Sequence, residues 1–64
     1  KSLQFRRSLY VVKDIAAGGT LTRDNVRAIR PGLGLAPKYI DQILGSRVTV
    51  AAKRGTPVSW DLFR

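Results

Sequence analysis

Apolar positions along the chain form short clusters separated by glycine and polar residues, which is typical of a small β-rich domain. β-Branched and aromatic residues at 8–12 and 47–50 predict two strands. The segment 26–29 is too short for a helix, and we expect it to continue as extended chain toward Pro31. The pattern therefore predicts a fold that is mostly β with short helices.

One stretch has helical rather than strand periodicity. Ile40, Ile43 and Leu44 stand at i, i+3 and i+4, which predicts one short helix over 37–44 that ends at Gly45. Its apolar face is expected to join a core formed by the apolar residues of the strands. The expected core comprises Leu9, Val11, Ile15, Leu21, Ile40, Ile43, Leu44, Val48 and Val58.

The chain contains an internal duplication. Residues 11–26 align without gaps with residues 48–63, and each copy has an apolar strand, a glycine turn, an apolar residue, a hydroxyl residue and an aspartate. The matched pairs are Gly18 with Gly55, Leu21 with Val58, Thr22 with Ser59, Asp24 with Asp61, and Val26 with Phe63. Because Thr22 and Ser59 are favoured capping residues, we expect each to begin a short helical turn. The duplication predicts a compact domain with pseudo-two-fold internal symmetry.

Length and composition exclude several classes of function. A chain of 64 residues forms one small domain with little room for a deep active site. It has neither cysteine nor histidine, so the thiolate and imidazole metal ligands and the usual neutral-pH general base are absent. The four acidic residues, all aspartates, are spread along the sequence. We therefore assign no catalytic and no metal-binding residue, and we do not expect this domain to catalyse a reaction alone.

The start of the sequence and its lack of methionine suggest a piece of a longer protein. The chain starts at Lys1, contains no methionine, and has neither a signal peptide nor an apolar run long enough to span a membrane. We expect residues 1–7 to be the end of an interdomain linker and residues 8–64 to be the domain itself.

The formal net charge of +8 raises the question of a polyanionic partner. The twelve basic residues are scattered, with only Arg6-Arg7 and Lys53-Arg54 adjacent, and no aromatic residues interleave with them as in single-strand binders. A nucleic-acid or polyanion-binding module stays an alternative. A basic face turned toward an anionic partner, or toward an acidic surface of the same protein, is the other explanation.

A single arginine on a stiff loop is the candidate binding residue. Pro31 fixes its own φ and restricts Arg30, while Gly32 and Gly34 permit turns and close backbone approach. The planar guanidinium of Arg30 suits carboxylate, phosphate or carbonyl oxygens. From these residues alone, a solvated arginine beside an ordinary loop is the favoured interpretation.

Several segments in this order resemble one known domain. They are Arg7 to Ile15, Gly18, Leu21-Thr22, Asp24-Asn25-Val26, Arg30-Pro31-Gly32 with Gly34, Tyr39, Ile43-Leu44-Gly45, and Lys53 to Pro57 with Ser59. Together they resemble the C-terminal antifreeze-like (SAF) domain of bacterial sialic acid synthases, a group that includes N-acetylneuraminate, legionaminate and pseudaminate synthases. The resemblance implies a β-clip fold, which agrees with the duplication.

The resemblance also implies a role within a larger cytoplasmic bacterial transferase. In such enzymes a (β/α)₈ barrel carries phosphoenolpyruvate, a divalent metal (Mn²⁺ or Mg²⁺) and the catalytic groups. The small domain crosses over in a domain-swapped homodimer and caps the partner subunit's active site. There the family's arginine, matched by Arg30, reaches the acetamido region of an N-acetylated hexose such as N-acetylmannosamine, with Pro31, Gly32 and Gly34 as loop support.

The implied partners are thus the barrel and the sugar, with no cofactor in this domain, no nucleic acid and no membrane. The reaction would condense phosphoenolpyruvate with the hexose to form a nonulosonic acid. Ice binding is a remaining alternative because the domain is named after antifreeze proteins, but twelve strong cations disfavour a flat, weakly polar ice-binding face.

Overall fold

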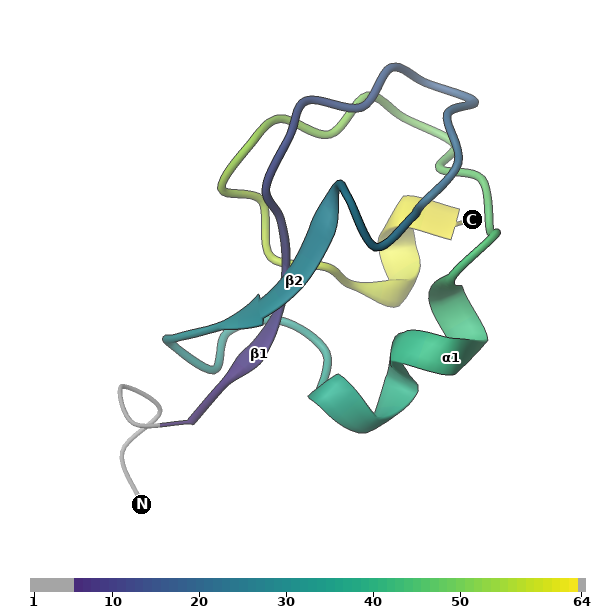
Figure 1. Cartoon of the computed structure of the whole chain (residues 1–64). Helices are drawn as coiled ribbons and strands as arrows, with labels where there is room; N and C mark the ends of the chain where they lie inside the picture. Colours follow the sequence, from purple (N-terminus) through teal and green to yellow (C-terminus); the bar gives the residue numbers. More distant parts are fainter. Residues whose placement is uncertain (1–5, 64) are drawn as a thin grey trace.

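The computed structural model describes residues 6–63 and contains one two-stranded antiparallel sheet (Figure 1). Strand β1 (Ser8–Val11) pairs with β2 (Val26–Ile29), in a register that places Ser8 opposite Ile29 and Val11 opposite Val26. The strand expected to start at Ser8 and the extended chain expected over 26–29 are therefore both confirmed. What the sequence did not predict is that they pair with each other.

The prediction of a second strand over 47–50 is wrong. Within it Arg47 forms only an isolated bridge with Thr20, and the chain then bends at Thr49 and Val50. Val48 is buried in the core, but Val50 is 53% exposed. The β-branched residues of this segment thus do not form a continuous ladder, because the chain turns away to run toward the carbonyl of Leu62.

The predicted helix is present in two short parts. A 3₁₀ helix η2 (Pro37–Tyr39) leads into α1 (Ile40–Ile43), and Gly45 follows with a φ of 85°. Ile43 is buried, whereas Ile40 and Leu44 are only half-buried. These two residues are therefore not among the fully buried core residues, contrary to the prediction. No helix within residues 6–63 is long and apolar enough to cross a membrane.

A last 3₁₀ helix, η3 (Trp60–Phe63), packs beside η2. The rings of Trp60 and Tyr39 meet edge to face with centroids 5.5 Å apart. The core lies between the sheet and these short helices, and it includes the other seven expected residues. Its buried members are Leu9, Val11, Ile15, Leu21, Val26, Ile43, Val48, Ala52, Val58 and Leu62.

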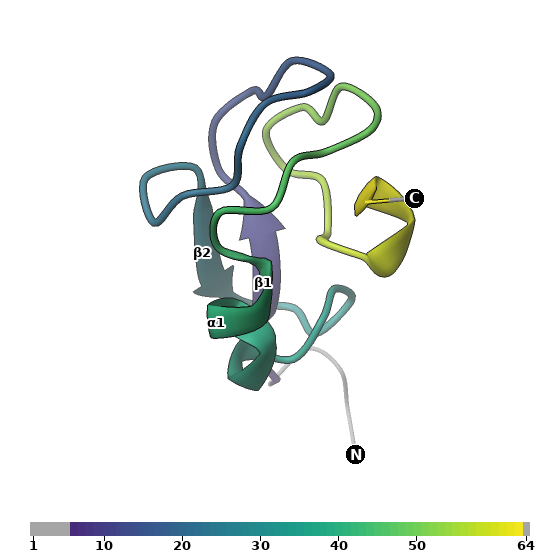
Figure 2. The ribbon, with the colours of Figure 1, turned by 90° about the vertical axis from the view of Figure 1, so that its right-hand side faces the viewer.

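Backbone hydrogen bonds repeat with the same offset as the sequence duplication. Gly18 N–H donates to Val48 O at 2.8 Å, and the equivalent Gly55 N–H donates to Val11 O at 2.7 Å. Ile15 and Ala52, which occupy equivalent places in the two copies, exchange reciprocal hydrogen bonds of 2.7 and 2.8 Å. Figure 2 shows the loops of the two copies side by side. The predicted pseudo-two-fold symmetry is therefore present in the backbone, and the domain is mostly β with short helices.

The two glycine turns and the hydroxyl turns also correspond. Gly18 and Gly55 have φ values of 84° and 95°, a region that side chains avoid. Thr22 Oγ1 accepts from the N–H of Asp24 at 3.2 Å, as expected for a turn-initiating hydroxyl. The backbone turns match as well, because Asn25 N–H donates to Thr22 O at 3.2 Å and the equivalent Leu62 N–H donates to Ser59 O at 3.1 Å.

Candidate binding loop after strand β2

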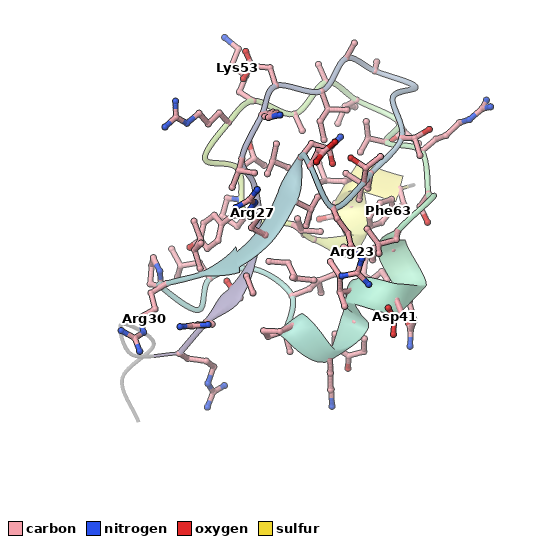
Figure 3. All side chains as sticks on the ribbon, in the orientation of Figure 1. Arg23, Arg27, Arg30, Asp41, Lys53 and Phe63 are labelled. Atoms are coloured by element: carbon pink, nitrogen blue, oxygen red, sulfur yellow. The ribbon has the colours of Figure 1, made fainter. Side chains whose placement is uncertain are left out.

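Arg30 lies directly after β2, where the chain leaves the sheet. Figure 3 shows its side chain beyond the end of the strand, away from the labelled Arg23 and Asp41. The side chain is exposed, and the Arg30–Pro31 peptide bond is cis. Within residues 6–63 the one salt bridge joins Arg23 to Asp41, so no described carboxylate pairs with the guanidinium of Arg30.

A buried hydroxyl at the start of β1 holds the loop that follows Arg30. Ser8 is 1% exposed, and its Oγ donates to Pro31 O at 2.9 Å and accepts from Gly34 N–H at 2.9 Å. The hydroxyl of Ser8 therefore links Pro31 and Gly34, the two ends of the loop segment 31–34. Sequence analysis assigned no role to Ser8. The available signal was a small polar residue at the first position of an otherwise apolar strand.

Gly34 lets the loop lie flat against the core. A Cβ at this position would collide with the carbonyl oxygen of Leu9 and lie 3.0 Å from the amide nitrogen of Val58. The next residue, Leu35, accepts from Leu9 N–H and donates to Val58 O, both at 2.9 Å. Since any side chain at Gly34 would push the backbone off these two partners, glycine is required here.

Gly32 occupies the outer side of the same loop. A Cβ there would lie 3.0 Å from the Cβ of Arg6. The chain entering the domain therefore passes over the loop, and Pro31, Gly32 and Gly34 form its backbone together. The structure brings these three residues and Arg30 into one segment, which is fixed on its inner side by Ser8.

A hollow of about 330 Å³ opens beside Arg30. It is shallow, and it is lined by Arg7, Ala28, Ile29 and Arg30. Ile29 is 41% exposed, which is high for an isoleucine on a strand. Two arginines and two apolar residues therefore border this hollow.

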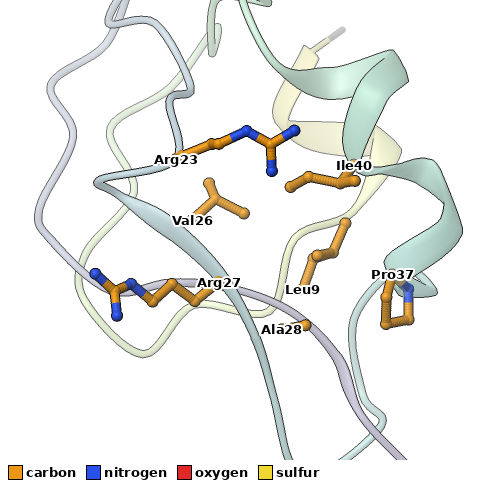
Figure 4. Close-up of a pocket in the computed structure, with 7 residues that line it drawn as sticks. All are labelled: Leu9, Arg23, Val26, Arg27, Ala28, Pro37 and Ile40. Carbon is orange, nitrogen blue, oxygen red and sulfur yellow. The ribbon is translucent and has the colours of Figure 1, made fainter.

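A second hollow, of about 370 Å³, lies between β2 and the η2–α1 segment (Figure 4). Its floor is apolar, and Arg23 crosses it while its guanidinium forms an exposed 3.5 Å ion pair with Asp41. Arg27 also borders this second hollow. Arg27 of β2 and Arg30, which follows β2, therefore border different hollows.

No metal-binding group was assigned from the sequence, and residues 6–63 contain no cluster of three or more side chains that would hold a metal ion. Two of the four aspartates have a recorded partner among these residues. Asp14 accepts from the backbone N–H of Arg54 at 2.7 Å, and Asp41 pairs with Arg23.

The described residues form a small, pseudo-symmetric, mostly β domain with an arginine-bearing loop between its two copies. The sequence profile of the SAF domain matches residues 6–64. The chain therefore belongs to the SAF domain family, and the resemblance drawn from its sequence is confirmed.

The similar proteins are much longer than this chain. It is 49% identical over 57 residues to a pseudaminic acid synthase of Helicobacter pylori, covering 89% of this chain and 17% of that protein. It is 34% identical over 56 residues to an N,N'-diacetyllegionaminic acid synthase of Legionella pneumophila, covering 88% of this chain and 16% of the relative. The chain thus spans about a sixth of the relatives that it matches.

The fold is also found in a solved structure. The chain superposes on a spore coat polysaccharide biosynthesis protein, spsE, of Bacillus subtilis with a TM-score of 0.83 and 26% sequence identity. The match covers 95% of this chain and 18% of that protein. The SAF fold therefore occurs there as one part of a larger chain.

Proposed function

We propose that this chain is the substrate-capping and dimerisation domain of a cytoplasmic bacterial synthase that makes a nonulosonic acid. The reaction condenses phosphoenolpyruvate with an N-acetylated hexose. The observation that carries the proposal is the 49% identity to a pseudaminic acid synthase over 89% of the chain. Since identity to the diacetyllegionaminic acid synthase is lower, at 34%, a pseudaminic-type product is the first to test.

The geometry of the loop supports a capping role. Ser8 fixes the loop from below, and Arg30 extends from it without a carboxylate partner among the described residues. Because the backbone of the loop is already fixed, binding of a carbonyl oxygen by the guanidinium orders the side chain of Arg30 and not the loop. In this proposal Arg30 donates to the acetamido oxygen of the hexose in the partner subunit's active site, and the domain excludes water from that site.

The domain supplies positioning, and the catalytic groups lie in the (β/α)₈ barrel. A divalent metal, Mn²⁺ or Mg²⁺, would also be held by the barrel and would act there as a Lewis acid. This division of labour agrees with the chemistry of the chain, whose described residues offer guanidinium donors and apolar contacts. Closure over the barrel by a domain of the other subunit is what couples dimer formation to activity.

Replacing Arg30 in the full-length synthase tests the proposal. We expect Arg30→Ala to lower kcat/KM for the hexose by about tenfold to a hundredfold, because a charge-assisted hydrogen bond contributes about 1.5–3 kcal/mol. The dimer and its melting temperature should be unchanged, since the side chain is exposed. Steady-state kinetics with phosphoenolpyruvate and the hexose, together with light scattering, measure both.

Arg54→Ala is the matched control. Arg54 is also an exposed arginine, but it lies in the second copy, where its backbone N–H bonds to Asp14. Its removal takes away the same charge and should leave kcat/KM within about twofold of the wild type. Wild-type kinetics for Arg30→Ala would remove this residue from the active site.

A further inference from the structure

We propose that the free edge of β2 binds an extended segment of the same synthase, from outside this domain, as a third strand, and that this segment carries an acidic residue opposite Arg27. The inference goes beyond the proposed function, which concerns Arg30 and the substrate. It rests on that function in one respect, because the chain must be joined to the remainder of a synthase. The surface concerned is the edge of β2 that faces away from β1, with the hollow of about 370 Å³ beside it.

The backbone groups of β2 point alternately toward β1 and away from it. In an antiparallel pair, residues that exchange hydrogen bonds alternate with residues whose N–H and C=O point outward. Leu9 of β1 is of the outward kind, because its N–H donates to Leu35 O and its C=O accepts from Val58 N–H, both at 2.9 Å. Its partner across the ladder is Ala28, and Val26 follows the same alternation two residues earlier. The backbone groups of Ala28 and Val26 therefore point away from β1.

Most of these outward-pointing groups have no partner in this domain. Val26 N–H is used by a turn, since it donates to Thr22 O at 3.1 Å. Within residues 6–63 no hydrogen bond is recorded for Val26 C=O or for the N–H and C=O of Ala28. Figure 2 shows β1 along one side of β2 and no other segment of residues 6–63 along its opposite side. The outer side of β2 is thus an edge to which a further strand can be added.

The side chains along this edge indicate the sequence of the added strand. Figure 4 shows Val26 and Ala28 on one side of the β2 ribbon and the Arg27 guanidinium on the other, as expected for a strand. The hollow with the apolar floor lies on the Val26 side, and within residues 6–63 Arg27 forms no salt bridge. A segment with the alternating pattern apolar–acidic–apolar would direct its apolar side chains over the hollow and its carboxylate toward Arg27. Opposite charges stabilise such a cross-strand pair.

The same features disfavour a second copy of this chain as the added strand. Two β2 strands paired antiparallel, with Val26 of each opposite Ala28 of the other, would place their Arg27 side chains directly opposite each other. Like charges in that position destabilise the pair. A short edge strand that carries an exposed cation is a common protection against pairing between identical molecules.

The length of the edge indicates a tethered partner. β2 has only four residues, so a strand arriving from solution would gain few hydrogen bonds from it. A covalently connected segment has an effective concentration on the order of millimolar, which allows a contact of this size to form. This chain spans 17% of the pseudaminic acid synthase of Helicobacter pylori, and in this proposal the corresponding remainder of the synthase supplies the segment.

Amide hydrogen exchange in the full-length synthase tests the pairing directly. Arg27 lies opposite Tyr10 in a hydrogen-bonded position, so its N–H is protected by β1 in any case. With the added strand, the Ala28 amide should be protected to within about tenfold of the Arg27 amide. Exchange at Ala28 that is more than about a hundredfold faster than at Arg27 would overturn the proposal. Residue-resolved mass spectrometry measures both amides in one sample, and the Arg27 amide reports that the sheet is folded.

Arg27→Glu tests the acidic residue of the added strand. The reversal places two carboxylates opposite each other, so it should lower the protection of the Ala28 amide by about tenfold or more while the amide of residue 27 stays protected. Arg54→Glu is the matched control, because Arg54 is also exposed and its backbone N–H bonds to Asp14 rather than to β2. This control should change the protection of Ala28 by less than about twofold. Equal effects of the two reversals, or no effect of either, would overturn the proposal.

Zero-length cross-linking identifies the occupant of the edge. Arg27→Lys keeps the positive charge and supplies an amine that a carbodiimide joins to a carboxylate in contact with it. A link to an acidic residue of the synthase outside this domain is the expected result. A link only to an aspartate of an SAF domain, a link to a separate protein, or the absence of any link would overturn the proposal.

The added strand and the proposed function fail separately. Condensation of phosphoenolpyruvate with an N-acetylated hexose measures the function, whereas exchange at Ala28 requires no substrate. An active synthase with an unprotected Ala28 amide would leave the function in place and overturn the added strand alone. A protein that condenses neither substrate but protects Ala28 would do the reverse.

Discussion

The hydroxyl of Ser8 is almost fully buried, and it bonds to both ends of a four-residue stretch of the loop that carries Arg30. Ser8→Ala removes that link and leaves Pro31 O and Gly34 N–H without this partner in a part-buried place. We expect the free energy of unfolding to fall by about 1–3 kcal/mol, since unsatisfied buried polar groups cost about that much. Urea unfolding of the chain measures the change.

Ser46→Ala is the control for this experiment. Ser46 is half-buried, and within the described residues no hydrogen bond is recorded for its hydroxyl. Its replacement should change the unfolding free energy by less than about 0.5 kcal/mol. If Ser8→Ala behaved like Ser46→Ala, the Ser8 hydroxyl would not be what holds the loop.

The contrast between Arg30 and Ser8 shows what a sequence can predict at the residue scale. Arg30 stands out because proline and two glycines surround it, and these residues restrict a chain whatever its tertiary contacts. Ser8 does not stand out, because its hydrogen-bond partners are more than twenty residues away. The role of Ser8 depends on how closely the loop over 31–34 approaches β1, and only the folded backbone defines that distance.

At the scale of elements, the duplication makes a quantitative prediction. Gly18 and Gly55 are equivalent, both have positive φ, and a Cβ at either would meet nothing within 4 Å. Only the backbone conformation is therefore at stake. Gly18→Ala and Gly55→Ala should each lower the unfolding free energy by about 1–2 kcal/mol, the usual cost of a left-handed conformation for alanine.

The informative quantity is the difference between the losses of unfolding free energy in Gly18→Ala and Gly55→Ala. Losses that agree within about 0.5 kcal/mol would show that the two copies are equivalent in energy as well as in hydrogen bonding. The double variant should show the sum of the two losses. A large loss at one glycine alone would mean that the sequence duplication is not matched by the energetics.

Elements were predictable where local pattern and tertiary pairing agreed. The helix over 37–44 was found because its apolar spacing, Pro37 and Gly45 all give the same signal. The strand over 47–50 was not formed, although its composition is that of a strand. Segment 8–12 pairs with β2 at four consecutive positions, whereas segment 47–50 has only the isolated bridge between Arg47 and Thr20.

At the scale of the whole molecule, the net charge of +8 belongs to cations that do not converge on one stripe. Figure 3 shows Lys53 at the top of the view and Arg30 at the lower left, while Arg23 and Arg27 lie between them and border one hollow. Such a distribution suits contact with an acidic protein surface on several sides better than the tracking of a nucleic-acid backbone. A cap that lies across another subunit requires that kind of contact.

The proposed domain swap can be tested by mixing two inactive subunits. One carries Arg30→Ala and an intact barrel, and the other carries an intact cap and a barrel inactivated by mutation. If the cap acts on the other subunit, each mixed dimer contains one site with both an intact barrel and Arg30. Random pairing of equal amounts should then restore about a quarter of the wild-type sites.

The control keeps both lesions in one subunit. Mixing that double variant with wild type gives mixed dimers in which the wild-type barrel receives the defective cap, so each mixed dimer should be nearly inactive. If Arg30 served its own barrel, the first mixture would show no gain and the second would retain half of the wild-type activity. The two mixtures therefore give opposite results for the two arrangements, because the position of Arg30 relative to the barrel is the only difference between them.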